Sequence, residues 1–401
     1  MSPSPGTSPV VPRTVKGLAL VSLFNDFASE MIYPLLPAFI TRVLGGNAVM
    51  LGALDGAADL TASMVRWFSG RLADRPGWRK PLILGGYLSA VLIRPLISVA
   101  SAAWQVVGFR VLDRIGKGLR SPARDALVAQ VTAPAARGRA FGFHRAADHL
   151  GAVAGSVAAW VLLSRHADVR QVIAMSAIPG VVAFGVLAVV LRGAEGQAGG
   201  WSDVRAVGRS DGPMVGDAAG RSFWQPVAAL VFLTVGRLPE ALILLRLQDM
   251  GVAIVAVPLA WAALHVVRTL AAYPGGWLSD HLGPRGTIAL GGVVFAGVIL
   301  ALAAALPPAL AVATFLALGL VTGLTEAAER AVVAQLAPIR MGSGFGSWQA
   351  LAGLAALPAA LLFGWVYQAV SGPAALAASA GAVGLGTAAW LAVSAAARRP
   401  A

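Results

Sequence analysis

A short basic turn, residues 70–81, joins two long apolar stretches of the chain. It holds four cationic residues, one carboxylate and two glycines, and it is too short to be a domain. Two apolar segments joined by so tight a basic turn favour an antiparallel membrane hairpin with the turn in the cytoplasm. A similar turn, residues 275–286, follows about half a chain later. The matched residues are Asp74 and Asp280, Gly77 and Gly283, and Arg79 and Arg285. Two such turns indicate a duplicated membrane protein.

The composition supports a membrane protein. Of the 401 residues, 57% are hydrophobic and only 12% are charged, whereas soluble domains carry about 25% charged residues. Cysteine is absent, which excludes disulfides and thiolate metal sites. The net charge of +13 is spread over short links between apolar segments, so it does not form the continuous basic patch that nucleic-acid binding needs. We expect no nucleic-acid partner.

Apolar runs between helix-breaking residues predict twelve membrane spans, each near the 20 residues that a bilayer requires. The predicted spans are 16–42, 48–70, 81–100, 103–127, 140–164, 171–192, 222–247, 253–278, 286–306, 309–335, 344–369 and 373–396. A polar linker, 193–221, separates six spans from six. The predicted domains are a disordered tail 1–15, an N-terminal bundle 16–192, a C-terminal bundle 222–396 and a short tail 397–401.

Basic residues gather in the links that follow even-numbered spans, as cytoplasmic loops do. Both termini are therefore predicted to be cytoplasmic, and the chain is expected in a bacterial-type plasma (inner) membrane. The duplication extends beyond the turns, because Ala126–Gln130 at the end of span four resembles Ala331–Gln335 at the end of span ten. Phe141-Gly142 likewise resembles Phe345-Gly346.

The turn reads G-x-L-A-D-R-x-G-x-R-K and follows span two of twelve, which resembles the major facilitator superfamily (MFS). Arg110 and Gly116 on span four resemble the second motif of that family, although Asp113 and Arg114 depart from it. Gly151 and Gly155 on span five resemble the antiporter motif, but a serine follows where that motif has proline.

The resemblance implies an all-α membrane protein with twelve transmembrane helices in two pseudo-symmetric six-helix bundles. It also implies a secondary transporter that works by alternating access. We expect a proton-coupled exporter, an antiporter, of small organic molecules such as drugs or metabolites. Its expected partners are this solute, protons and the lipid bilayer, and we expect a monomer. A proton gradient would drive it without a cofactor. We expect no enzyme, because neither a phosphate-binding Walker loop nor a nucleophile elbow is present.

Charged residues inside spans are costly and indicate function. Asp26, Glu30 and Tyr33 share one face of span one, and Asp55 and Asp59 share one face of span two. The candidates for proton coupling and the central cavity are Asp26, Glu30, Tyr33, Asp55, Asp59, Arg94, Arg110, Asp113, Arg114, Arg145, Asp148, His149, Arg237, Glu240, Arg268 and Glu326. The acid-rich N-terminal half favours proton coupling and a cationic or zwitterionic substrate.

An alternative interpretation is a buried ion-pair network that only stabilises the N-terminal half. In either case we expect Arg94, Arg110 and Arg114 to pair with the acids of spans one, two and five, because an unpaired buried charge is costly.

In facilitators the motif turn closes the cytoplasmic side of the transporter. By that resemblance Asp74 lies at the N-terminus of span eleven, and Arg75 or Arg79 pairs with Asp125. The predicted cytoplasmic gate comprises Gly70, Asp74, Arg75, Gly77, Arg79, Lys80, Arg124, Asp125, Asp280 and Arg285.

Two other functions remain open from the sequence. One is efflux of a metal ion or chelate, since carboxylates suit hard cations, but no protein metal site is assigned. The other is a receptor or scaffold of the same fold that transports nothing.

Overall fold

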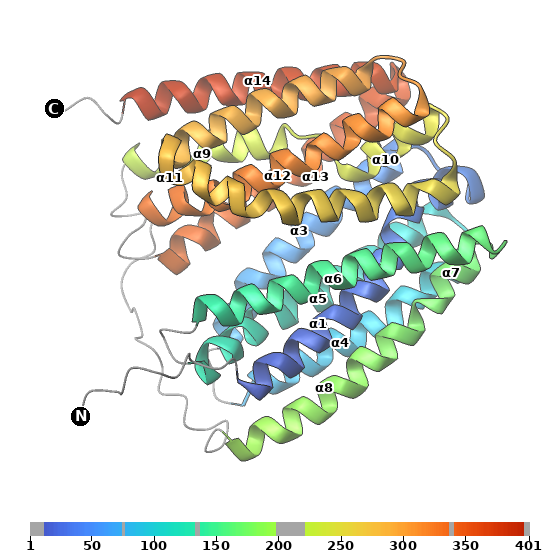
Figure 1. Ribbon diagram of the computed structural model, residues 1–401, viewed down its shortest axis with the longest axis vertical. Helices are drawn as coiled ribbons and strands as arrows, with labels where there is room; N and C mark the ends of the chain where they lie inside the picture. Colours follow the sequence, from blue (N-terminus) through green and yellow to red (C-terminus); the bar gives the residue numbers. More distant parts are fainter. Residues whose placement is uncertain (1–11, 74–76, 133–136, 198–220, 337–340, 397–401) are drawn as a thin grey trace. The chain divides into compact units, whose positions relative to one another are not determined.

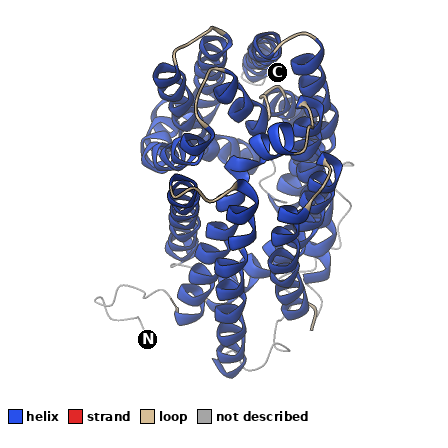
Figure 2. Cartoon of the chain, turned by 90° about the vertical axis from the view of Figure 1, so that its right-hand side faces the viewer, coloured by secondary structure: helices blue, strands red, loops and turns tan. Residues whose placement is uncertain are grey.

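The computed structural model describes residues 12–73, 77–132, 137–197, 221–336 and 341–396. The described residues form helices and connecting turns, and none of them lies in a strand (Figure 2). Among them, ten helices are long and apolar enough to cross a membrane. The predicted all-α membrane class is confirmed. Most of the tails and of the linker 193–221 lies outside the described residues.

Two predicted spans fall outside these ten because of their own polar residues. Span one is a continuous helical stretch, α1 (Arg13–Ile32) followed by short 3-10, α and π turns to Val43. Span four is α5 (Ala103–Val131), whose 29 residues are about 43 Å long at 1.5 Å each. Both helices are long enough to span a bilayer. Their charges lower the hydropathy, and they carry much of the candidate site.

The chain divides into two compact units, which are described separately. The first consists of Met1–Tyr33, Val65–Val99 and Leu112–Arg209, and the second of Pro34–Met64, Ala100–Val111 and Ser210–Ala401. Helix α3 (Ala48–Ala73) and helix α5 each contribute one part to each unit.

In the first unit, α1 packs against α6 (Arg137–Ser164) and α8 (Ala177–Gln197) (Figure 1). Helix α4 (Arg79–Leu96) packs against α8 and against α7 (Val169–Met175). The glycines of the predicted antiporter motif explain the first contact. A Cβ on Gly151 or Gly155 would collide with the backbone of α1 at Leu23 or Phe27. The motif therefore brings two helix backbones together.

The second unit is built around α11 (Val257–Ala303), α12 (Pro308–Leu336), α13 (Met341–Ala369) and α14 (Gly372–Ala396). Helix α11 combines predicted spans eight and nine, and Gly283 with φ 74° separates its two parts. Its partner in the motif turn, Gly77, has φ 82°. Glycine adopts this left-handed conformation without the steric cost of a Cβ. Both copies of the turn therefore use the same glycine conformation.

Predicted span seven is broken into α9 (Arg221–Val235) and α10 (Glu240–Asp249). Proline at 239 disfavours helix at the residue before it. The hydroxyl of Ser379 on α14 accepts from the Leu238 N–H at 2.9 Å and donates to the Gly236 carbonyl at 2.8 Å. One side chain thus satisfies two backbone groups that the break leaves open, as an apolar environment requires.

One helix contact occurs in both halves of the chain. Ser69 and Gly275 each lie five residues before the matched aspartates, and Gly118 and Gly323 each lie eight before the matched alanines of spans four and ten. The Ser69 hydroxyl donates to the Gly118 carbonyl at 2.7 Å. A Cβ on Gly275 would lie 2.5 Å from the Gly323 carbonyl oxygen. The duplication is therefore visible in the packing.

Candidate functional site

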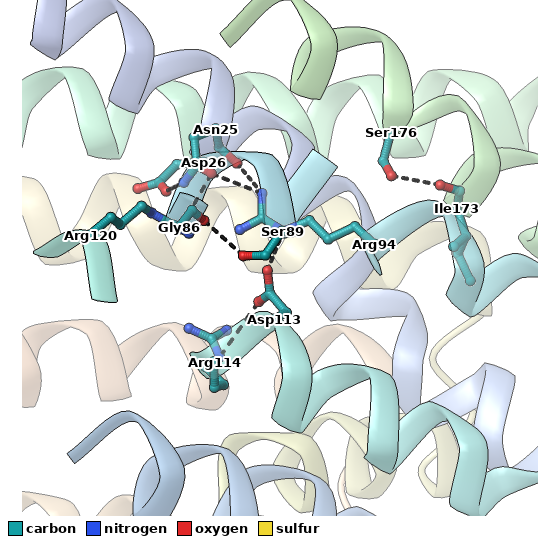
Figure 3. A network of polar contacts seen from close by, with 10 residues as sticks. All are labelled: Asn25, Asp26, Gly86, Ser89, Arg94, Asp113, Arg114, Arg120, Ile173 and Ser176. Carbon is teal, nitrogen blue, oxygen red and sulfur yellow. Dashed lines mark hydrogen bonds and ion pairs between the residues drawn. The ribbon is translucent and has the colours of Figure 1, made fainter. Parts of the chain in front are cut away.

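A buried ion pair between α4 and α5 forms the centre of the first unit's polar network (Figure 3). Arg94 Nε donates to Asp113 Oδ1 at 2.9 Å. Arg94 Nη1 donates to the Asn25 carbonyl at 2.8 Å and to its side-chain Oδ1 at 3.2 Å. Both charged side chains are almost fully buried. The pair joins three helices, because Asn25 lies on α1.

Asn25 connects this ion pair to Asp26. Its Nδ2 donates to Asp26 Oδ1 at 2.9 Å, while its Oδ1 also accepts from Arg120 Nη2 at 3.3 Å. Arg120 Nη1 donates to the Gly86 carbonyl at 2.8 Å, and its guanidinium lies over the Tyr87 ring. Two arginines therefore fix the amide that holds Asp26, as Figure 3 shows.

Asp26 faces charges of both signs. Lys117 and Arg94 attract its carboxylate, whereas Asp148 and Glu30 repel it. A carboxylate in such surroundings changes all of these interactions when it gains a proton. Tyr33 is buried at the end of α1, and the Glu30 carbonyl accepts from the Ser156 hydroxyl at 3.4 Å. This serine occupies the proline position of the antiporter motif.

Asp148 on α6 has two basic neighbours on its own helix. His144 Nδ1 lies 3.5 Å from Asp148 Oδ1, and Arg145 Nη1 lies 3.6 Å from Oδ2. His144 is buried, while Arg145 is largely exposed. His149 was the predicted histidine and is half-buried. The structure places the buried histidine five residues earlier.

The second unit brings together two further ion pairs. Arg237 Nη2 donates to Glu329 Oε1 at 2.9 Å, and Arg268 donates to Glu240. Glu329 is buried, whereas the predicted Glu326 is exposed one helical turn earlier. The buried ion pair of α12 therefore uses Glu329, and the role predicted for Glu326 stays a prediction.

Asp55 caps a helix of the second unit. Its Oδ2 accepts from the Ala241 N–H at 3.0 Å, in the first turn of α10. Arg110 and Asp59 lie within electrostatic range of Asp55, and Arg110 is buried whereas Asp59 is exposed. The candidates from span two therefore belong to the second unit.

Part of the predicted cytoplasmic gate is described. Arg79 is buried and Lys80 is half-buried. A Cβ added to Gly70 would lie 4.0 Å from the Cβ of Pro122. Asp125 Oδ1 is 3.0 Å from Arg124 Nη2 and is half exposed. The Arg285 carbonyl accepts from Trp390 at 3.0 Å. Asp74, Arg75 and the side chain of Asp280 lie outside the described residues, so the gate stays a prediction.

The ion pair expected for Arg94 forms with a different partner. Arg94 contacts Asp113 on span four rather than an acid of span one, two or five. The reason is that α4 and α5 meet at glycines, since a Cβ on Gly86 would lie 2.5 Å from the Gly116 carbonyl oxygen. Arg114 Nε also lies 3.9 Å from Asp113 Oδ2.

The candidates predicted from the sequence omit both charged and uncharged members of the polar network. Asn25, Tyr87 and Arg120 join the network although none was a candidate. A search for intramembrane charges does not select an asparagine or a tyrosine. A search for every polar residue within the predicted spans would have included Asn25, which directly precedes Asp26.

Comparison with known proteins identifies the family. A family model described as Major Facilitator Superfamily matches residues 18–263. An uncharacterized MFS-type transporter of Methanocaldococcus jannaschii is 26% identical over 365 residues, which cover 89% of each chain. The multidrug resistance protein MdtH of Proteus mirabilis is 33% identical over 134 residues, 33% of each chain.

The fold is similar to that of solved transporters. The crystal structure of a bacterial homolog to the human lysosomal transporter Spinster, in an inward-facing and unoccupied conformation, matches with a TM-score of 0.68 at 17% identity. The match covers 98% of this chain and 96% of that chain. The chain belongs to the Major Facilitator Superfamily. It is a multi-pass membrane transporter and not an enzyme.

Proposed function

We propose that this transporter exports small organic molecules in exchange for protons by alternating access. The observation that carries the proposal is the position of Asp26 in a buried polar network. Its carboxylate is held by Asn25, whose amide is fixed in turn by Arg94 and Arg120. Intramembrane carboxylates of this kind are typical of proton pathways in transporters.

The charge balance around Asp26 supports a role as proton carrier. When Asp26 is ionised, it offsets the positive charge of Lys117 and Arg94. When it binds a proton, that offset is lost while Asp113 still compensates Arg94. The local field therefore becomes more positive. A conformational equilibrium shifts only when its two states interact differently with the proton or the solute.

The relatives are consistent with export. The multidrug resistance protein MdtH matches a third of the chain, so it bears on the proposal without defining a substrate. We further propose a monomer in a bacterial-type plasma membrane. We also propose that both termini are cytoplasmic, because the basic links follow even-numbered spans.

The test is proton movement in proteoliposomes under an imposed pH gradient. Organic cations, organic anions and divalent metals would be added in turn, with a pH-sensitive dye on the inside. We expect an organic solute to release the gradient through the wild-type protein. In Asp26→Asn this solute-dependent flux should fall at least 10-fold, because the carboxylate can no longer carry a proton.

Asp168→Asn is the matched control. Asp168 caps α7 in an exposed turn, and asparagine caps helices equally well, so its flux should equal that of wild type. Normal gradient-driven flux in Asp26→Asn would remove Asp26 from the mechanism. Flux driven by a divalent metal alone would favour metal efflux, and flux for no compound would favour a non-transporting receptor.

A further inference from the structure

A cavity of about 180 Å³ lies among the C-terminal helices, entirely within the second unit. It is lined by the break between α9 and α10 and by α10, α11 and α12. Phe295, Phe315 and Leu318 are among its apolar walls, and Arg237, Glu240 and Arg268 form its polar side. The walls therefore suit a solute with an apolar body and one polar group.

The two arginines on the polar side of the cavity are not fully hydrogen-bonded within the protein. Arg237 Nε and Arg268 Nε are both buried, and neither has a hydrogen-bond partner among the described residues. A buried donor without an acceptor is destabilising. Both arginines line the cavity and keep part of their side chains exposed, 21% for Arg237 and 15% for Arg268, so a bound solute can reach the guanidinium groups.

The two arginines differ in how firmly they are already paired. Glu329 holds Arg237 and is 11% exposed in its side chain, whereas Glu240 holds Arg268 and is 42% exposed. Glu240 is the first residue of α10, and its half-exposed side chain makes its ion pair the less enclosed of the two. The Arg268 guanidinium, in contrast, is fixed over the Trp261 ring at 5.5 Å. Arg268 is thus the stationary partner and Glu240 the exchangeable one.

We propose that this cavity binds the carboxylate of an organic acid or zwitterion, which displaces Glu240 from Arg268. The guanidinium presents a planar fork that matches a carboxylate in two parallel hydrogen bonds. The apolar part of the solute then packs against Phe295, Phe315 and Leu318. This inference rests on the proposed transport of small organic molecules, and it names their chemical class.

The test is equilibrium binding to the purified full-length protein in detergent, without any gradient. The probes are 3-phenylpropionate, 3-phenylpropionamide and 3-phenylpropylammonium, which share one apolar body and differ in the polar group. Binding is followed by calorimetry. We expect the carboxylate to bind at least 10-fold more tightly than the amide and the ammonium to bind most weakly.

Two variants of the exchangeable pair give opposite expectations. Arg268→Gln should weaken binding of 3-phenylpropionate at least 10-fold, because the charged fork is lost. Glu240→Gln should strengthen it several-fold, because the competing carboxylate is removed. A purely structural ion pair would make both variants weaker binders. Arg165→Gln, at an exposed position after α6, is the control and should match wild type.

Equal affinity for the three probes, or tightest binding of the ammonium, would overturn the proposal. So would weaker binding in Glu240→Gln than in wild type, provided that the variant unfolds at the wild-type temperature. Because no proton gradient is used, loss of proton coupling in the flux assay and loss of carboxylate binding here are separate results.

Discussion

At the scale of single residues, the ion pair between Arg94 and Asp113 is the most constrained feature of the first unit. Both side chains are buried, and Arg94 also bonds the backbone of α1. Removal of one partner from a buried pair leaves an uncompensated charge, which costs about 3–5 kcal/mol. Replacement of both partners by apolar residues is often close to neutral.

Asp113→Asn should therefore lower the thermal unfolding temperature in detergent by several degrees. The double variant Arg94→Met with Asp113→Leu should recover part of the loss. Asp125→Asn is the comparison, because Asp125 is half exposed and its pair with Arg124 is expected to be worth about 0–1 kcal/mol. An equal fall in unfolding temperature for Asp113→Asn and Asp125→Asn would contradict the structural importance of the buried pair.

The sequence predicts which charged residues lie in the buried network better than it predicts their partners. Asp26, Arg94 and Asp113 stand out because charge inside a span is expensive. Their connection through Asn25 depends on the rotation of α1 relative to α4 and α5, which the sequence does not specify. The expected pairing of Arg94 with an acid of span one, two or five is wrong for the same reason, because its partner Asp113 lies on span four.

At the scale of the element, the break in span seven could not be located from the apolar pattern. Residues 222–247 form one apolar run, yet the helix stops after Val235 and restarts at Glu240. Pro239 is a signal for a break. The backbone groups that the break leaves open are hydrogen-bonded by Ser379, however, which lies on a helix more than a hundred residues away in the chain. The restarted helix α10 then gains a cap from Asp55.

This cap yields a prediction for α10. Loss of a helix cap costs about 0.5–2 kcal/mol, so Asp55→Ala should make the amide hydrogens of Ala241–Ile243 exchange several-fold faster with solvent. Asp55→Asn keeps a side-chain oxygen at the same place and should exchange almost as slowly as wild type. The measurement is hydrogen–deuterium exchange read by mass spectrometry. Similar exchange rates in both variants would show that Asp55 acts through its charge and not as a cap.

At the scale of the whole molecule, the all-helical membrane class and the family follow from the sequence, because apolar length and the repeated turn are strong constraints. The predicted spans agree with the helices to within a few residues at most ends. The division of the helices into two compact units is harder to predict from the sequence, because α3 and α5 each contribute to both units.

The motif turn should control which side of the membrane the substrate path faces. A charge-assisted hydrogen bond is worth about 1.5–3 kcal/mol. If such a bond forms in only one of two conformations, its loss changes the ratio of the two conformations about 10-fold or more. Asp74→Asn is expected to populate the cytoplasm-open state and to slow turnover, with little change in substrate affinity. Labelling of single engineered cysteines at each end of the path measures this, because the natural chain has no cysteine.

Accessibility that stays the same at both ends in Asp74→Asn would leave the turn as a signal for membrane orientation alone. A matched control is Asp168→Asn, in the exposed cap of α7, which should label as wild type does.

The helix contact of Ser69 with Gly118 and of Gly275 with Gly323 has a consequence for the ancestry of the chain. The helices of both copies are in contact at the same position, although residue 69 is serine and residue 275 is glycine. An ancestor with a small residue at this point could therefore drift toward serine in one copy and glycine in the other without separating the helices. Descent from one six-helix gene is then recorded in the position where two helices approach each other, even where the residues at that position differ.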